Sequence, residues 1–262
     1  MDNKFNMYGL TFDIDWAPDC AIEKAAKPLI DNQIKCTWFV THLSPYVEKL
    51  FEYSDIFEFG IHPNFFPGSS HGNTHKEVLK HICSIVPGSK IFRTHALYQS
   101  SRLISIMVDD FGMETDTNLL LYLTPNILPH KIYFKHNSKG IVRIPFFWED
   151  DIAMYDPNFS WNIKSAVYHP DGIKIFNFHP ILVYLNSESI YSYEKLKTLK
   201  SLNLLSEQEI LPYINNDINK GIGVFFNNLI LYLKEKNITF YKLSEVKDLY
   251  QNNMDTSNKH TS

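Results

Sequence analysis

The sequence alternates between short apolar stretches and longer helix-like stretches over most of its length. The apolar stretches are rich in bulky or β-branched residues, and most are followed by polar residues and a run with helical periodicity. Strands that alternate with helices in this way form parallel sheets. No G-x-G-x-x-G motif follows the first stretch, which disfavours a dinucleotide-binding fold. We therefore predict a single-domain α/β fold, an irregular barrel of seven or eight parallel strands with its active site at the carboxyl ends of the strands.

The pattern assigns most of the chain to strands and helices. Strands are expected at residues 8–12, 36–40, 56–61, 90–93, 112–118, 141–147, 172–178 and 239–243. Helices are expected at residues 20–32, 44–53, 76–85, 100–110 and 223–236, with a polar, helix-prone segment at 184–216. No internal linker or repeat is evident, so residues 1–250 are predicted to form one domain and residues 251–262 a disordered polar tail.

Composition excludes several classes of protein. The chain has 262 residues, of which 44% are apolar, so it can bury a sizeable core. Its net charge of −4 argues against a nucleic-acid or anionic-membrane partner. There is no apolar run of about 18 residues and no signal peptide, and the three cysteines form no C-x-x-C pair. These features predict a cytoplasmic protein without a membrane span, and they leave the oligomeric state open.

Two aspartates, Asp13 and Asp15, close the first strand in the stretch Y-G-L-T-F-D-I-D-W. Residues two apart in a strand point to the same side, so both carboxylates are expected on one face. Two carboxylates at such a short distance repel each other. The pair becomes stable when a cation binds one of them or when one takes up a proton. Aspartate is also common in turns, so this motif alone leaves a solvated turn open.

Polar residues end most of the other predicted strands as well. Any one of them is compatible with a solvated loop or a helix N-cap, but the carboxyl ends of parallel strands meet on one face, where an active site is expected. The strand-end residues are His62, Asn64, Arg93, His95, Asp116, Asn118, Trp148, Glu149, Asp150, Asp151 and His179.

Five short segments of the chain, taken in order, resemble the motifs of one family. The sequence is similar to NodB-homology polysaccharide deacetylases of carbohydrate esterase family 4, and resembles their WbmS-like branch, over roughly residues 8–245. The segments are T-F-D-I-D at 11–15, T-W-F-V at 37–40, F-G-I-H-P-N at 59–64, R-T-H at 93–95 and F-N-F-H-P at 176–180. They resemble the family's T-F-D-D-G motif, its second strand, and its histidine, arginine and late L-x-H motifs.

The resemblance implies a role for each matching residue. Asp13 would be the general base, oriented by Arg93, and His179 would be the general acid. Asp15 and His62 would bind a metal ion, although this chain separates its two aspartates by one residue. The family's second metal-binding histidine would stand at position 66, which is phenylalanine here. We expect His71 in the following glycine-flanked loop to replace it, with His75 as the alternative.

The same resemblance implies the ligands of the site. Trp148, Asn64 and Asp150 are expected to contact the sugar, and Asp150 is also placed to pair with His179. The cofactor would be a divalent transition metal, with Zn²⁺ favoured over Fe, Co, Ni or Mn.

The predicted function is metal-dependent removal of an acyl group, acetyl in the first place, from an N-acylated sugar or glycan precursor in surface-polysaccharide biosynthesis. One alternative is a catalytically degenerate homologue that binds glycan or metal. Another is a HAD-type phosphatase with Asp13 as nucleophile. An Fe(II) oxygenase also uses two histidines and a carboxylate, but on an all-β barrel.

Overall fold

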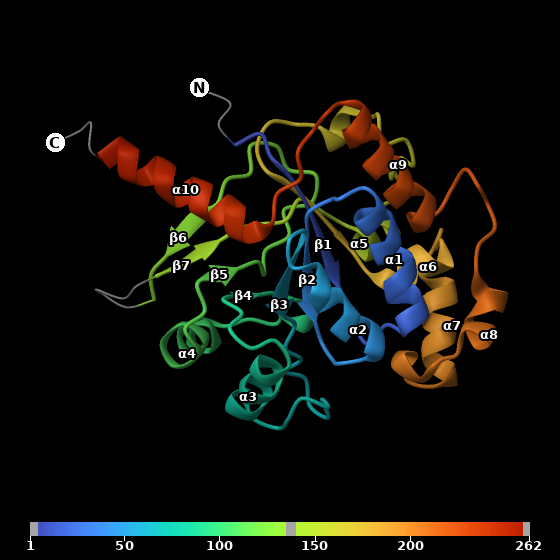
Figure 1. Cartoon of the computed structure of the whole chain (residues 1–262), viewed down its shortest axis with the longest axis horizontal. Coiled ribbons are helices and arrows are strands. Elements are labelled where there is room, and N and C mark those ends of the chain that lie inside the picture. The colour runs from blue at the N-terminus through green and yellow to red at the C-terminus, as the bar shows by residue number, and fades with distance from the viewer. Residues whose placement is uncertain (1–4, 135–139, 259–262) are drawn as a thin grey trace.

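The computed structural model describes residues 5–134 and 140–258 of the protein. The strands in this part of the chain form one curled sheet with the order β6-β7-β5-β4-β3-β2-β1-β9-β8 (Figure 1). Every pairing in it is parallel except that of β6 with β7. The strands are β1 (Tyr8–Asp13), β2 (Cys36–Val40), β3 (Phe57–Ile61), β4 (Ile91–Phe92), β5 (Thr115–Asp116), β6 (His130–Ile132), β7 (Ile141–Arg143), β8 (Trp148–Glu149) and β9 (Lys174–Phe178).

Helices surround the sheet, and α1, α2, α6, α7, α8 and α9 gather on one side of β1 in Figure 1. Helix α6 packs against both α1 and α9. The helices are α1 (Asp19–Asp31), α2 (Pro45–Leu50), α3 (His75–Ile85), α4 (Ser101–Phe111), α5 (Asp150–Ala153), α6 (Pro180–Leu185), α7 (Tyr191–Leu199), α8 (Glu207–Ile210), α9 (Ile222–Glu235) and α10 (Leu243–Asn258). Short 3-10 turns lie at Phe51–Tyr53, His95–Leu97, Ala166–Tyr168, Leu202–Leu204 and Leu211–Tyr213.

Strand β1 lies between β2 and β9 and separates an apolar layer from a polar one. Phe12 points toward the helices, where its ring stacks on Trp38 at 4.4 Å and meets the edge of Phe226 of α9 at 5.4 Å. The next residues along the strand alternate in direction, so Thr11 and Asp13 point to the other side. There they meet Arg93, whose guanidinium donates to both side chains. The alternation therefore directs polar groups to the inside of the curled sheet.

The parallel, irregular barrel predicted from the sequence is confirmed, with differences in the second half of the chain. The stretch 141–147 is not one strand, because β7 ends at Arg143 and β8 begins only at Trp148. Residues 239–243 form no strand either: Phe240 makes a single parallel bridge to Tyr8. Helix α10 continues past Gln251, where the sequence predicted a disordered tail, and residues 259–262 lie outside the described part.

No helix within the described residues combines the length and the apolar character needed to cross a membrane.

Candidate active site

Asp13 lies at the carboxyl end of β1 and is 3% exposed. Each of its oxygens has a donor: Arg93 Nη1 donates to Oδ1 at 3.0 Å, and Asn177 Nδ2 donates to Oδ2 at 3.0 Å. Two donors, one after β4 and one on β9, fix the plane of the carboxylate. Asp13 is thus a buried and oriented carboxylate.

Arg93 follows β4 and is fully buried. Its guanidinium lies between the rings of Phe39 and Phe146, 4.5 and 4.3 Å from their centroids. Nη1 donates to Asp13, and Nε donates to the carbonyl of Thr117 at 3.3 Å. The aromatic rings and the carboxylate together hold a cation that burial would otherwise destabilise.

Asp15 forms a second centre with two histidines. His62 Nε2 and His95 Nδ1 both lie 3.0 Å from Asp15 Oδ1. Burial by itself would raise the pKa of Asp15, but the hydrogen bonds from His62 and His95 bring this pKa well below its usual range. Asp15 has a left-handed backbone, with φ of 44°, which bends the chain away from the strand direction. The carboxylate can therefore face the ends of β3 and β4.

These three residues fit a divalent metal ion. Zinc binds imidazole nitrogen and carboxylate oxygen at about 2.1 Å in tetrahedral geometry, so two of its ligand atoms are about 3.4 Å apart. Both nitrogen–oxygen distances are 3.0 Å, so a small separation of these side chains would admit the ion. His62 Nδ1 is buried without a hydrogen-bond partner and faces Asp13 Oδ1 at 4.0 Å, so the ring can keep its proton there and present Nε2 as a ligand. His95 belongs to this group, which the sequence analysis did not predict.

His71, the predicted second histidine ligand, is not brought into this group. Its Nε2 donates to the carbonyl of Thr41 at 2.8 Å, and its Nδ1 accepts from the backbone N–H of Asn64 at 3.1 Å. Burial lowers the pKa of His71 to about 4, so the ring is neutral and both nitrogens are already used. The alternative, His75, is the first residue of α3, and its ring packs on Phe65 at 5.3 Å.

His179 follows β9 and is held by Asp150. Its Nδ1 donates to Asp150 Oδ1 at 2.7 Å, and its backbone N–H donates to Oδ2 at 2.7 Å. Burial lowers the pKa of His179, but the buried Asp150 carboxylate outweighs this and raises it well above the usual range. Nε2 points to the other side and lies 3.6 Å from Asp15 Oδ2. His179 is thus a protonated imidazole aimed at the Asp15 centre.

These groups line one cavity of about 400 Å³. Its polar lining includes Glu149 and Asp151, which follow the end of a predicted strand but match none of the five family motifs. One wall comes from α7, which contributes Tyr193 and Lys197. Nothing in the sequence connected α7 with the site, because the segment is polar and carries no motif.

The three predicted sugar-binding residues lie elsewhere or have other partners. Trp148 is fully buried, stacks on Phe225 at 5.0 Å and belongs to the core. The side chain of Asn64 accepts from the N–H of Phe66 and shapes a turn. Asp150 is fully buried against His179 and is not available to a sugar.

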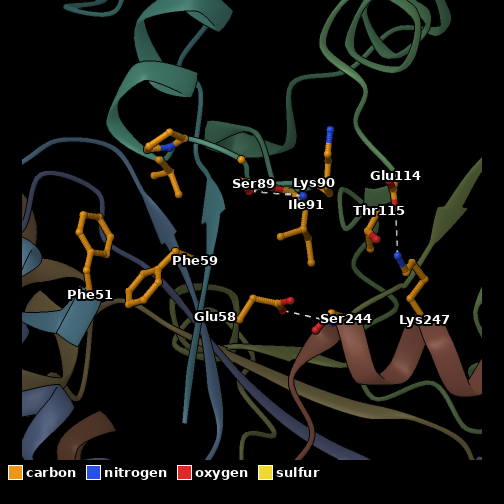
Figure 2. A pocket seen from close by; sticks show the side chains of 13 residues that line it. Phe51, Glu58, Phe59, Ser89, Lys90, Ile91, Glu114, Thr115, Ser244 and Lys247 are labelled. Atoms are coloured by element: carbon orange, nitrogen blue, oxygen red, sulfur yellow. Dashed lines mark hydrogen bonds and ion pairs between the residues drawn. The ribbon is translucent and has the colours of Figure 1, made fainter. Parts of the chain in front are cut away.

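A larger cavity of about 570 Å³ lies at the opposite, amino-terminal ends of β3, β4 and β5 (Figure 2). Its charged residues have structural partners: Glu58 accepts from the N–H of Ser244, and Lys247 pairs with Glu114 at 2.9 Å. Figure 2 shows these pairs joining the sheet to α10. No histidine lines this cavity, so the chemistry converges on the smaller one.

Comparison with known proteins agrees with this geometry. The family model for WbmS-like polysaccharide deacetylases matches residues 10–197. The chain belongs to this family. Its structure is similar to that of a Bordetella bronchiseptica protein described as a polysaccharide deacetylase involved in O-antigen biosynthesis, with 31% identity, a TM-score of 0.73, and coverage of 87% of this chain and 90% of the other.

A second solved structure shares the fold. Peptidoglycan deacetylase PdaC from Bacillus subtilis superposes with a TM-score of 0.52 at 12% identity, covering 100% of this chain and 99% of its own. No curated protein sequence matches the chain.

Proposed function

We propose that this WbmS-like deacetylase is a metal-dependent amide hydrolase that removes an acetyl group from an N-acetylated sugar. The observation that carries the proposal is the convergence of two histidines and a carboxylate beside an oriented base and a protonated imidazole. Asp15, His62 and His95 would hold the ion, and Zn²⁺ suits this set of one oxygen and two nitrogen ligands. This assignment replaces His71 by His95.

The side chains divide the proton transfers between them. The bound ion would lower the pKa of water and polarise the amide carbonyl. Asp13, held in place by Arg93 and Asn177, takes the proton of the attacking water. His179 gives its Nε2 proton to the nitrogen as the C–N bond breaks, so the amine leaves neutral. Asp150 keeps that imidazole protonated until then.

The substrate would be a sugar of a surface-polysaccharide precursor, modified in the cytoplasm. The description of the Bordetella bronchiseptica relative as a protein of O-antigen biosynthesis supports a substrate of this class. A HAD-type phosphatase reaction has no support from the family to which the chain belongs.

The metal assignment is tested by elemental analysis of the purified protein. Wild type is expected to contain about one equivalent of a transition metal, and His62→Ala and His95→Ala should lose it. His71→Ala is the matched control, since it removes a buried histidine next to the site but should keep the metal. Loss of metal in His71→Ala and retention in His95→Ala would reverse the assignment.

The reaction is tested by acetate release from a panel of N-acetylated hexosamines, free and in glycosidic linkage. Turnover by wild type and a loss of at least a hundredfold in Asp13→Asn at equal metal content are expected. A metal-loaded wild type that releases no acetate from any of them would disprove the hydrolase and leave a binding protein.

A further inference from the structure

Asn177 connects four polar side chains in the floor of the active site. It lies on β9 and is fully buried. Its Oδ1 accepts from Thr11 Oγ1 at 2.7 Å and from Arg93 Nη1 at 2.5 Å. Its Nδ2 donates to Asp13 Oδ2 and to Glu149 Oε1, both at 3.0 Å. The whole hydrogen-bonding capacity of the amide is therefore used, and its orientation is fixed.

This arrangement places a second carboxyl group beside the base. One amide group holds Asp13 and Glu149 side by side, and atoms of both lie within 4.8 Å of a ring nitrogen of His179. Glu149 is 7% exposed and lines the cavity. Among the described residues its one hydrogen bond is the one to Asn177, so the second carboxyl oxygen is free to meet a ligand. The proton transfers described above do not use it.

We propose that Glu149 is a substrate-binding residue that hydrogen-bonds the sugar hydroxyl next to the acetamido group, and that Asn177 positions it together with the base. This inference rests on the proposed function for its choice of ligand. Asp13 and His179 act on the two sides of the scissile C–N bond, so Glu149 reaches only substrate groups close to that bond. In a linked 2-acetamido sugar, the neighbouring carbons carry the glycosidic oxygen and the 3-hydroxyl group. The 3-hydroxyl is the group that can both donate and accept.

The environment of Glu149 suits a neutral partner. Burial, and the nearby carboxylates of Asp151 and Asp13, raise the pKa of Glu149 to about 8. A protonated carboxyl group can both donate to a hydroxyl and accept from it. Glu149 is therefore suited to a neutral hydroxyl group such as the 3-hydroxyl.

The test compares each variant on a sugar with and without that hydroxyl. The probes are the methyl glycosides of N-acetylglucosamine and N-acetylgalactosamine and their 3-deoxy analogues. Glu149→Leu should lower kcat/KM for a parent sugar about 10- to 100-fold, mainly through KM, and should change the value for its 3-deoxy analogue less than threefold. Glu149→Gln, which keeps size and hydrogen-bonding groups, should lose less than Glu149→Leu. Asn177→Leu should lower kcat as well, because it also releases the base.

Glu194→Leu is the matched control. Glu194 lines the same cavity from α7, but it is exposed and pairs with Lys197 at 2.9 Å. Its loss should affect parent and deoxy sugars alike. Thermal melting and metal content of each variant separate a damaged fold from a lost contact.

Equal losses in Glu149→Leu on parent and deoxy sugars would overturn the inference. If metal-loaded wild type turns over no sugar, the proposed function fails, and calorimetric binding of the same four glycosides then decides. Binding of a parent sugar that weakens at least tenfold in Glu149→Leu, with no such change for its deoxy analogue, supports the contact. Equal weakening, or no binding by wild type, refutes it.

Discussion

The ion pair of Arg93 and Asp13 allows a quantitative test of the site, because both groups are buried and 3.0 Å apart. At an effective dielectric constant of about 20, two unit charges at this distance attract by about 5.5 kcal/mol. Removing one partner of a buried pair costs about 3–5 kcal/mol, since the other charge is left without compensation. Arg93→Met should therefore lower the free energy of unfolding by this amount. For a chain of this size the midpoint of thermal unfolding should fall by about 6–20 °C.

A double-mutant cycle isolates the pair from the packing of the arginine stem between two aromatic rings. Asp13→Asn removes the charge that Arg93→Met would strand, so the double variant should be more stable than the sum of the single losses by about 2–3 kcal/mol. The assay is urea unfolding followed by circular dichroism, with all proteins at the same metal content. Single losses that simply add would show that the pair contributes no coupling, and the reasoning would be wrong.

Arg143→Met is the matched control for this cycle. Arg143 also pairs with a buried carboxylate, since its Nε donates to Asp116 at 2.7 Å, but neither residue lines the cavity. It should lose stability yet keep its acetate release below its melting temperature. Arg93→Met should lose both, because Asp13 is then no longer oriented.

Three further outcomes test other parts of the structure. Lys174 is buried with its ammonium group on the carbonyls of Pro170 and Gly172, and burial lowers its pKa from 10.5 to about 8. Between these two pH values the unfolded chain binds more protons than the folded one, so the stability of wild type should rise with pH. Measured by urea unfolding, the free energy of unfolding of wild type should increase by about 2 kcal/mol relative to Lys174→Met from about pH 7.5 to about pH 9.5. A difference that does not change with pH would mean that the carbonyls keep the amine charged. Trp148→Ala should cost about 3–5 kcal/mol by calorimetric melting while the metal content stays at the wild-type value, since Trp148 belongs to the core, and loss of the metal would contradict this placement. Chelation should destabilise wild type by about 2.7 kcal/mol if the ion was present at a hundred times its Kd, and it should leave the melting of His62→Ala unchanged. An equal shift of the melting temperature in both proteins would mean that the metal ion binds outside this site.

Much of the site follows from the positions of residues along the chain. In a parallel barrel the strand ends share one face, so Asp13, His62 and His179 could be placed together before any coordinates were known. The family motifs occur in the same order along the chain, and they gave each of these three residues a role. The core likewise follows from apolar periodicity, as the packing of Phe12 between β2 and α9 shows.

The choice between histidines did not follow from the sequence, because it depends on backbone geometry in loops. His95 reaches Asp15 through a turn in which Ala96 and Leu97 have φ of 51° and 53°, a conformation rare outside glycine and asparagine. The glycine-flanked loop of His71 does fold back toward the site, yet two backbone groups occupy its ring nitrogens. The flexibility of this loop thus predicted that His71 lies near the site, but it could not predict whether His71 binds the metal ion.

Strand alternation explains both the error at Trp148 and the overlooked role of Glu149. Consecutive residues of β8 point to opposite sides of the sheet, so only one of the two can face the cavity. Trp148 packs against Phe225 of α9, which leaves Glu149 on the inner side next to Asn177. Asn177 itself stands where the L-x-H motif has leucine, so the resemblance to the family could not point to it. Residues that differ from a family motif but lie on the inner side of a strand are therefore where this chain is expected to differ in specificity.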